Sequence, residues 1–266
     1  MTTLVRTMQG TVLWGGFRVW QRNRDAFVRS WRVEVGGITI EPFVMLVALG
    51  FGLGSYIQDV GQDFGESSYA IFLAPGVAAS YVMWHATFDS TYGAFLRMEA
   101  HHIYEAVLFT PLGPEDIVVG EILWSASKGV LSATFVLIVA AIFGWVGSPF
   151  AVLVLPAAFL IGIMFAAIAM VMTATAATIG SMNNFYTLFI LPMFWLGGVF
   201  FPLERLPEAV QRASWVLPLT PAVALVRGLM AGDFSWWMAL WILELAAYSL
   251  ASLLLASFFM RRRLIK

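Results

Sequence analysis

The sequence predicts an all-α integral membrane protein. We expect six transmembrane helices, an N-terminal amphipathic interfacial helix and two short external re-entrant helices between spans five and six. Of the 266 residues, 60% are hydrophobic and only 12% are charged, whereas soluble domains average about 45–50% apolar and about 25% charged residues. The stretch from Gly129 to Leu203 holds no charged residue and no histidine. Since one span needs about 20 apolar residues, this stretch alone must contain at least two helices.

The distribution of basic residues is the third indication, and it also predicts the orientation. Apolar runs define six spans, at residues 38–57, 69–94, 116–145, 149–179, 185–201 and 234–259. Eleven of the fifteen basic residues then share one side of the membrane: Arg6, Arg18, Arg22, Arg24, Arg29, Arg32, Arg97, Arg261, Arg262, Arg263 and Lys266. Cytoplasmic loops are enriched in Lys and Arg, so both termini are predicted to lie in the cytoplasm.

This division gives three segments. Residues 1–37 form a cytoplasmic N-terminus with an amphipathic helix, residues 38–260 form the six-helix membrane domain, and residues 261–266 form a basic cytoplasmic tail. Cysteine is absent, which excludes disulfides and thiolate metal sites.

The amphipathic helix is predicted over residues 12–32. At about 100° per residue, one face collects the apolar side chains of Leu13, Phe17, Trp20, Phe27 and Trp31. The opposite face collects Arg18, Arg22, Arg29 and Arg32, while Arg24 interrupts the apolar stripe. This pattern is typical of a helix lying in the membrane interface with its basic face toward anionic headgroups. Two compatible interpretations stay open: a membrane anchor, and a docking surface for a cytoplasmic partner.

The connection between spans two and three, residues 95–121, is the largest on the predicted cytoplasmic side. Residues 97–108 are compatible with a short helix lying across the membrane surface, and the prolines and glycine of residues 111–114 force a break after it. Its polar side chains are those of Arg97, Glu99, His101, His102 and Glu105. A metal site needs three or four converging ligands, and no further histidine or cysteine is near. We therefore expect no metal there.

Ionisable residues also occur within or near the spans. Lys128 lies in span three and Glu244 in span six, with Glu121 and Asp89 nearer the cytoplasmic ends. Charged groups at membrane depth face the bundle interior or a water-filled cavity and find a partner. We predict an intramembrane ion pair of Lys128 with Glu244 or Asp89. Such a pair either fixes helix packing or forms a polar point on a substrate path.

The external segment after span five, residues 202–233, is unusually apolar. Prolines divide it into two short helical pieces, at about 207–216 and 221–231, and neither reaches the about 20 residues of a span. Because backbone at membrane depth must be helical or buried in protein, we expect re-entrant helices within about residues 203–232. Gly197 and Gly198 allow span five to bend or pack closely beneath them.

Two stretches of sequence carry a family resemblance. FWLGGVFFPLERLP followed by PLTPAVALVRGLM resembles the C-terminal signature of type-two ABC exporter permeases, and LFTPLGPEDIVVGEILW at residues 108–124 resembles their coupling region. More narrowly, the whole chain is similar to the nodulation-factor (lipo-chitooligosaccharide) exporter permease branch. The resemblance implies an ATP-driven exporter of an amphiphile, such as a lipo-oligosaccharide, a lipid-linked glycan or a hydrophobic drug.

The resemblance also implies partners. Such permeases form dimers, here expected to be homodimers in membrane lipid, with two separate ATPase subunits underneath. The sequence has no GxxxxGK(S/T) phosphate-binding loop. No cofactor is therefore expected on this chain, and ATP and Mg²⁺ are expected on the partner ATPase. Residues 97–108 would be the coupling helix, with Arg97, Glu99 and Glu105 as exposed charges in a cleft of that ATPase.

A dimer-interface path in this family would be lined mainly by spans two and five. The aromatic candidates for that path are Tyr81, Trp84, Phe88, Phe189, Trp195, Phe200 and Phe201. Aromatic side chains suit sugar rings and acyl chains, although they also form ordinary interfacial belts. Phe200 and Phe201, beneath the re-entrant helices, are the predicted external gate.

Other function classes receive less support from the residues. An intramembrane enzyme acting on lipid would need a clustered acid/base or metal constellation, and none is recognisable, so the chain is predicted to be a transport subunit and not an enzyme. An ATP-independent secondary carrier or channel remains the alternative. It would show several charges along a midplane path, or broken helices in both halves of the chain, whereas a break is evident only in the C-terminal half. Nothing indicates a nucleic-acid partner.

Overall fold

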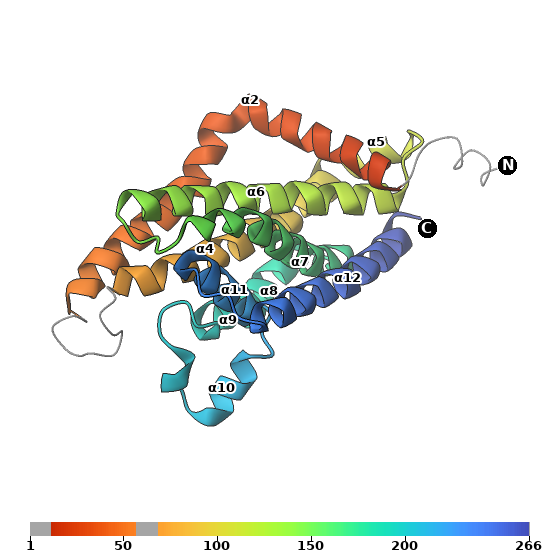
Figure 1. Ribbon diagram of the computed structural model, residues 1–266. Helices are drawn as coiled ribbons and strands as arrows, with labels where there is room; N and C mark the ends of the chain where they lie inside the picture. Colours follow the sequence, from red (N-terminus) through yellow and green to blue (C-terminus); the bar gives the residue numbers. More distant parts are fainter. Residues whose placement is uncertain (1–11, 57–68, 266) are drawn as a thin grey trace.

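The computed structural model describes residues 12–56 and 69–265, and every regular element in these ranges is a helix (Figure 1). Five helices are long and apolar enough to cross a membrane, and a bent pair could provide a sixth crossing. The five run over Trp14–Tyr56, Tyr69–Ala100, Pro114–Ile142, Pro149–Thr175 and Trp237–Leu264. The all-α membrane fold is confirmed, whereas the count of six spans stays a prediction.

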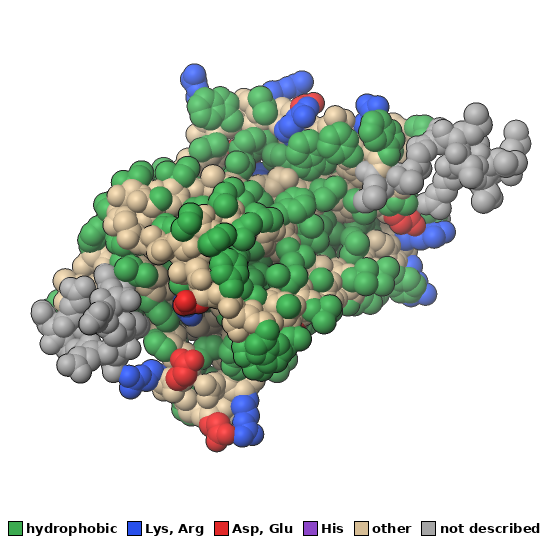
Figure 2. All heavy atoms as spheres, in the orientation of Figure 1, with side chains coloured by type: hydrophobic (Ala, Val, Ile, Leu, Met, Phe, Trp, Pro, Cys, Tyr) green, Lys and Arg blue, Asp and Glu red, His purple; other side chains and the backbone are tan. Residues whose placement is uncertain are grey.

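The bundle has two distinct ends in Figure 1. The short helix α5 (Ile103–Leu108) and the last turns of α12 (Trp237–Leu264) lie together at one end, which we call the α5 end. The short helix α10 (Glu208–Ser214) lies away from them, at what we call the α10 end. Hydrophobic side chains cover most of the face in Figure 2, and the charged ones gather near its edges. This is the surface expected of a bundle surrounded by lipid.

The N-terminal amphipathic segment and the first span form one continuous helix. α2 runs over Val12–Val47 and passes directly into the π-helical segment η1 (Ala48–Leu53). The predicted boundary at residues 37 and 38 falls within this helix and stays a prediction. α2 contains a Gly-Gly pair at residues 36 and 37 and Pro42, the residue types at which helices bend. Figure 1 shows this bend between the red and orange parts of the helix.

Helix α6 (Pro114–Ile142) packs against α2, α4 and α7. Its Gly120 lies so close to α2 that an added Cβ would come within 2.6 Å of the Gly16 carbonyl oxygen. A Cβ added at its Gly129 would lie 2.9 Å from Val82 Cγ1 of α4, and its Ala126 touches Gly162 of α7 (Val154–Thr175). Small residues at three crossings let three helix backbones approach α6 closely, as is common in membrane proteins.

The second span is longer than predicted. α4 (Tyr69–Phe88) continues through the π-helical segments η3 (Asp89–Gly93) and η4 (Leu96–Ala100), beyond the predicted end at residue 94. The chain then turns at His102, whose φ of 50° is left-handed, before α5 begins. The single coupling helix predicted over residues 97–108 is therefore corrected to two elements. In one helix Met98 and Tyr104 would face about 120° apart, and the turn lets both be buried.

The predicted fifth span is a helical run of three segments. α8 (Ile179–Phe185), η6 (Tyr186–Ile190) and α9 (Leu191–Leu196) follow one another without a gap. The run begins and ends earlier than the predicted 185–201 and is not among the five qualifying helices. At 1.5 Å per residue it is about 27 Å long, slightly less than the hydrocarbon thickness of about 30 Å.

Two short helices follow, where the prolines indicated them. After the 3₁₀ segment η7 (Leu203–Arg205), α10 is mostly exposed, whereas α11 (Leu219–Ala231) is mostly buried and packs against α4, α7 and α12. The two helices meet at 82°. α11 therefore returns into the bundle, and its re-entry into the membrane stays a prediction.

Helix α12 extends to Leu264, so the predicted tail at residues 261–266 begins inside a helix. Arg263 near its end donates hydrogen bonds from Nη1 to the carbonyl oxygens of Thr173 (2.7 Å) and Ala176 (2.6 Å) at the end of α7. Carbonyl groups at a helix C-terminus lack internal partners, and a cation suits them. At least this part of the basic tail binds protein and not lipid.

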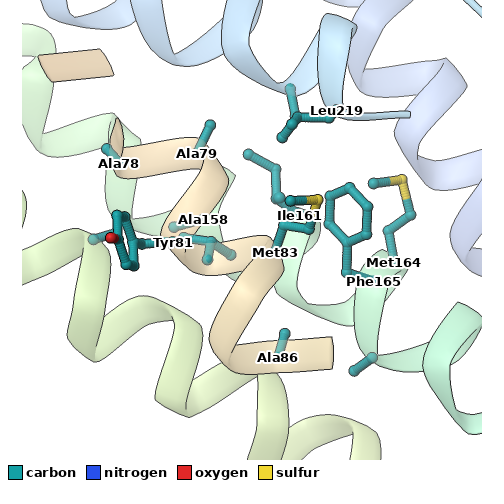
Figure 3. Packing of buried hydrophobic residues seen from close by; sticks show 14 of the residues in the cluster. Ala78, Ala79, Tyr81, Met83, Ala86, Ala158, Ile161, Met164, Phe165 and Leu219 are labelled. Carbon is teal, nitrogen blue, oxygen red and sulfur yellow. The ribbon is translucent and has the colours of Figure 1, made fainter. Parts of the chain in front are cut away.

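The core is rich in alanine and methionine. Figure 3 shows Met83 of α4 beside Ile161 and Phe165 of α7, with Ala79 and Ala86 on the same helix α4 and Leu219 of α11 close by. All are buried in one cluster. Small side chains on α4 leave room for the larger ones on α7 and α11.

Candidate functional site

An ionic cluster lies inside the bundle toward the α5 end. Its members are Arg22, Glu34, Asp89, Arg97, Glu121 and Lys128. The buried carboxylate of Asp89, at the start of η3, accepts hydrogen bonds from Lys128 Nζ (2.9 Å) and Arg97 Nη2 (3.1 Å). It also accepts one from Ser125 Oγ at 2.9 Å. π-helical segments such as η3 are frequent at functional sites.

Glu121 of α6 holds the other side of the cluster. Its carboxylate is fully buried and accepts from Arg97 Nη2 at 2.6 Å and from Arg22 Nη2 at 3.4 Å. Lys128 also donates to Glu34 Oε2 at 2.9 Å. The cluster therefore contains three cations and three anions, and it ties α2, the α4–η4 helix and α6 together. Buried charges are tolerated when they are paired in this way.

The sequence predicted part of this cluster. The structure brings Lys128 and Asp89 together as one of the two predicted pairings, whereas Glu244 lies half-buried on α12 and has no ionic partner among the described residues. Arg97 differs from the prediction because its side chain is only 17% exposed and points into the cluster. Sequence reasoning missed Glu34 and placed Arg22 on the basic face of the amphipathic helix, toward anionic headgroups.

The exposed part of the coupling region is α5 with the turn before it. His101, His102 and Glu105 are exposed, and His102 Nδ1 lies 3.3 Å from Glu105 Oε1. Glu99 is half exposed and accepts a hydrogen bond from Arg263 Nη2 at 2.8 Å. No group of three or more candidate metal ligands occurs in the part of the chain that the structure describes.

Tyr104 anchors α5 to the bundle. It is 1% exposed and is the buried side chain of this helix. Burial raises the pKa of the Tyr104 phenol well above its ordinary value, and the negative charge of Glu121 raises it further. The positive charges of Arg97 and Arg22 act on the phenol in the opposite direction. Tyr104 therefore places the buried side of α5 close to the ionic cluster.

An aromatic cluster joins α4 to the helical run of residues 179–196. It consists of Trp84, Tyr186, Phe194, Trp195 and Phe200. The ring of Phe200 lies 5.0 Å from that of Phe194 and 4.9 Å from that of Trp195, between ring centroids. Three of the predicted path residues thus lie in one group, which also contains Tyr186 and Phe194, two aromatic residues of the run that we had not singled out.

The other predicted path residues lie at the edge of this cluster or apart from it. Phe88 and Phe189 are exposed, and the rings of Tyr92 and Phe185 connect them to Tyr186. Phe201 is half-buried. Tyr81 is buried on another face of α4, where its hydroxyl donates to Met45 Sδ of α2 at 3.4 Å. Its side chain therefore belongs to the contact between α2 and α4 and not to the aromatic cluster.

A short loop, residues 198–201, carries Phe200 and is attached to the bundle at three successive residues. The Gly198 carbonyl oxygen accepts from Arg227 Nη2 of α11 at 2.9 Å, and the Phe200 carbonyl oxygen accepts from the Tyr69 hydroxyl at 3.1 Å. Between them Val199 packs on Gly76 of α4, where an added Cβ would lie 2.8 Å from the Val199 carbonyl oxygen. Sequence reasoning missed Arg227, although it is the single charge in residues 213–232.

Comparisons with known proteins agree with this architecture. The family model described as ABC-2 type transporter matches residues 17–231. Nodulation protein J of Sinorhizobium fredii is 36% identical over 252 residues, which cover 95% of this chain and 95% of that protein. Nodulation protein J of Rhizobium leguminosarum bv. viciae is 37% identical over 248 residues, 93% of this chain and 94% of that protein.

A more distant relative is the inner membrane transport permease YadH of Escherichia coli, 24% identical over 220 residues that cover 80% of each chain. The family match covers most of the chain, and the nodulation J proteins align over nearly all of it. The chain is therefore a membrane transport subunit that belongs to the ABC-2 type transporter family, in the branch that contains the nodulation J proteins.

Proposed function

We propose that the chain is the permease subunit of an ATP-driven exporter in the bacterial cytoplasmic membrane. It works as a homodimer with two separate ATPase subunits and moves an amphiphile outward, such as a lipo-oligosaccharide, a lipid-linked glycan or a hydrophobic drug. The absence of a phosphate-binding loop from the 266 residues supports a separate motor that binds ATP and Mg²⁺. Family membership supports the permease role.

The observation that carries the proposal is the construction of α5. This helix has only six residues, and its exposed side presents Glu105 beside His101 and His102 to a partner. Its buried side holds Tyr104 against the bundle beside the ionic cluster. A displacement of α5 would therefore be transmitted through Tyr104 to the ionic cluster, which joins three helices. Coupling of this kind requires a local contact that biases the arrangement of a packed bundle.

The aromatic cluster supports an amphiphilic substrate. Its rings lie between α4 and the helical run of residues 179–196, the two elements that would line the path in a dimer. Exposed Phe189 and Trp195 on the same run would face the second copy. Aromatic faces accept both sugar rings and apolar chains.

The first experiment is purification of the tagged chain from its native host in mild detergent, followed by mass spectrometry of the proteins that remain bound. An ATPase subunit near equal stoichiometry is expected. Glu105→Arg should reduce its recovery several-fold, because it reverses the exposed charge of α5. Arg97 is unsuitable for this test, since its side chain belongs to the ionic cluster.

Glu208→Arg provides a matched control. Glu208 is an exposed acid on the short helix α10, paired with Arg212 much as Glu105 is paired with His102. The variant should retain the ATPase at the α5 end. A chain that elutes alone in repeated preparations would contradict the proposal and would favour an ATP-independent carrier.

A further inference from the structure

Arg227 is an unusual residue for its position. It lies in the mostly buried helix α11, and no ion pair joins it to a carboxylate within the described chain, although the charge of Glu204 acts on it from a greater distance. Its Nε atom is buried without a hydrogen-bond partner. A buried cation of this kind is costly. A neutral side chain at this position would avoid that desolvation cost. The contribution of the guanidinium must therefore come from the groups that it binds.

The guanidinium of Arg227 joins three parts of the molecule. Nη2 donates to the Gly198 carbonyl oxygen at 2.9 Å and reaches the Phe72 carbonyl oxygen of α4 at 3.4 Å. Cζ lies 4.0 Å from the centroid of the Phe72 ring, a cation–π contact. Arg227 thus fastens the loop of residues 198–201 to α4 from a position on α11.

The loop depends on these contacts with side chains because its own backbone forms few hydrogen bonds. Residues 198–201 form no hydrogen bond with other backbone groups of the described chain. Gly198 has a φ of +74°, a left-handed conformation that glycine adopts readily and other residues adopt at a cost. The hydrogen bonds that hold this backbone come from the Arg227 and Tyr69 side chains.

The loop controls where Phe200 and Phe201 lie. Phe200 packs on Phe194 and Trp195 of α9 while the loop lies against α4. Val199 is then fully buried against Gly76. Release of the Gly198 carbonyl would leave the hydrogen bond from the Tyr69 hydroxyl to hold the backbone of residues 198–201, so Val199 and Phe200 would be held mainly by packing.

We propose that Arg227 is a positioning residue that holds the loop of residues 198–201 closed at the α10 end of the permease. The path opens when Arg227 releases the Gly198 carbonyl and the loop leaves α4. The inference rests on the proposed function, in which Phe200 and Phe201 form the external gate. It extends that function by assigning the closing contact to a charge on the neighbouring helix.

The natural absence of cysteine makes a direct test possible. Val199→Cys places a thiol of similar size at a fully buried position of the loop. Its rate of reaction with a membrane-impermeant maleimide, added outside spheroplasts, reports loop release. We compare this reporter with Arg227 intact, with Arg227→Met and with Arg227→Lys.

Arg227→Met should speed the labelling of Val199→Cys about five-fold or more, the effect of losing one net hydrogen bond to a charged donor. Arg227→Lys keeps a cation but loses the planar contact with Phe72, and should give an intermediate rate. Ala166→Cys, buried in α7 away from the loop, should stay unreactive in every background. Equal rates for Val199→Cys with and without Arg227 would overturn the proposal. Faster labelling of Ala166→Cys would also overturn it, because Arg227 would then stabilise the whole fold.

Failure of the proposed orientation gives a different result. Glu208→Cys on exposed α10 should react from outside at the same rate in all backgrounds. If it reacts only after permeabilisation, the external position of the α10 end is wrong. The labelling rates of Val199→Cys with Arg227→Met and with Arg227→Lys are then compared in detergent. The reagent reaches both sides of the protein there, so the comparison still tests the role of Arg227.

Discussion

Asp89 is the residue on which the ionic cluster depends most directly. It accepts three hydrogen bonds, from Lys128, Arg97 and Ser125, and its carboxylate is buried. Each of the three carboxylates in the cluster already has a cationic partner. The contacts therefore support a role in helix packing better than a polar point on the substrate path, since no acid is left to meet a substrate.

Removing one charge of the cluster should cost more than removing two opposite charges. Asp89→Asn should destabilise the protein by about 3–5 kcal/mol, because it leaves Lys128 and Arg97 short of a buried counter-charge. The double variant with Lys128→Met should be more stable than the sum of the single effects by about 1–3 kcal/mol. Unfolding in detergent, followed for the parent and the three variants, measures this coupling. Additive effects would show that the pair does not act as a unit.

Tyr104 allows a second prediction at the residue scale. Its hydroxyl has no hydrogen-bond partner among the described residues, whereas its ring is fully buried. Tyr104→Phe should change stability by less than about 1 kcal/mol, and Tyr104→Ala should cost about 3–5 kcal/mol locally by leaving a cavity. Amide hydrogen exchange of residues 103–108 distinguishes the two: only the alanine variant should exchange faster there. Fast exchange in the phenylalanine variant would contradict the unpartnered hydroxyl.

At the scale of elements, local signals predicted some boundaries well. α6 begins at Pro114, and Asp116 in its first turn accepts a hydrogen bond from the Gly113 amide at 2.7 Å. This is the capping that a proline followed by acids indicates. The break at His102 was missed because it is imposed by tertiary packing, which buries side chains on both sides of the turn. Helical periodicity within residues 97–108 contains no such signal.

The candidate site shows the same contrast between features with a local sequence signal and features set by tertiary packing. Lys128 and Asp89 could be paired from the sequence, since both are isolated charges in apolar spans. Glu34 and Arg22 could not, because their positions depend on how α2 bends along α6. Arg227 carried a signal, as the single charge in an apolar stretch, but its partners are main-chain carbonyl groups and no sequence pattern identifies those.

The crossing of α2 and α6 gives an element-scale prediction. In Gly120→Ala the new Cβ would lie 2.4 Å from Val19 Cβ, which forces the helices apart and should cost about 1–3 kcal/mol. Gly37→Ala is the matched control, because nothing lies within 4 Å of its new Cβ and alanine favours a helix. Thermal unfolding in detergent should show a lower midpoint only for the first variant. Equal midpoints would contradict the close packing of α2 on α6.

At the scale of the whole molecule, the two ends of the bundle should face opposite sides of the membrane. His101→Cys at the α5 end should react with an impermeant maleimide only after permeabilisation, and Glu208→Cys should react in intact spheroplasts. Both positions are exposed, so burial does not limit either reaction. Reaction of both from the same side would contradict the predicted orientation and the three crossings predicted between the two positions.

The charge balance of the ionic cluster has an electrical consequence. Moving one uncompensated charge across a membrane potential of 100 mV involves about 2.3 kcal/mol of work. With all six groups ionised, the three cations and three anions cancel. A shift of these six groups along the field as a unit would therefore involve almost no electrical work. In the proposed exporter, a motion that carries the cluster as a unit would be neither driven nor opposed by the membrane voltage acting on these groups.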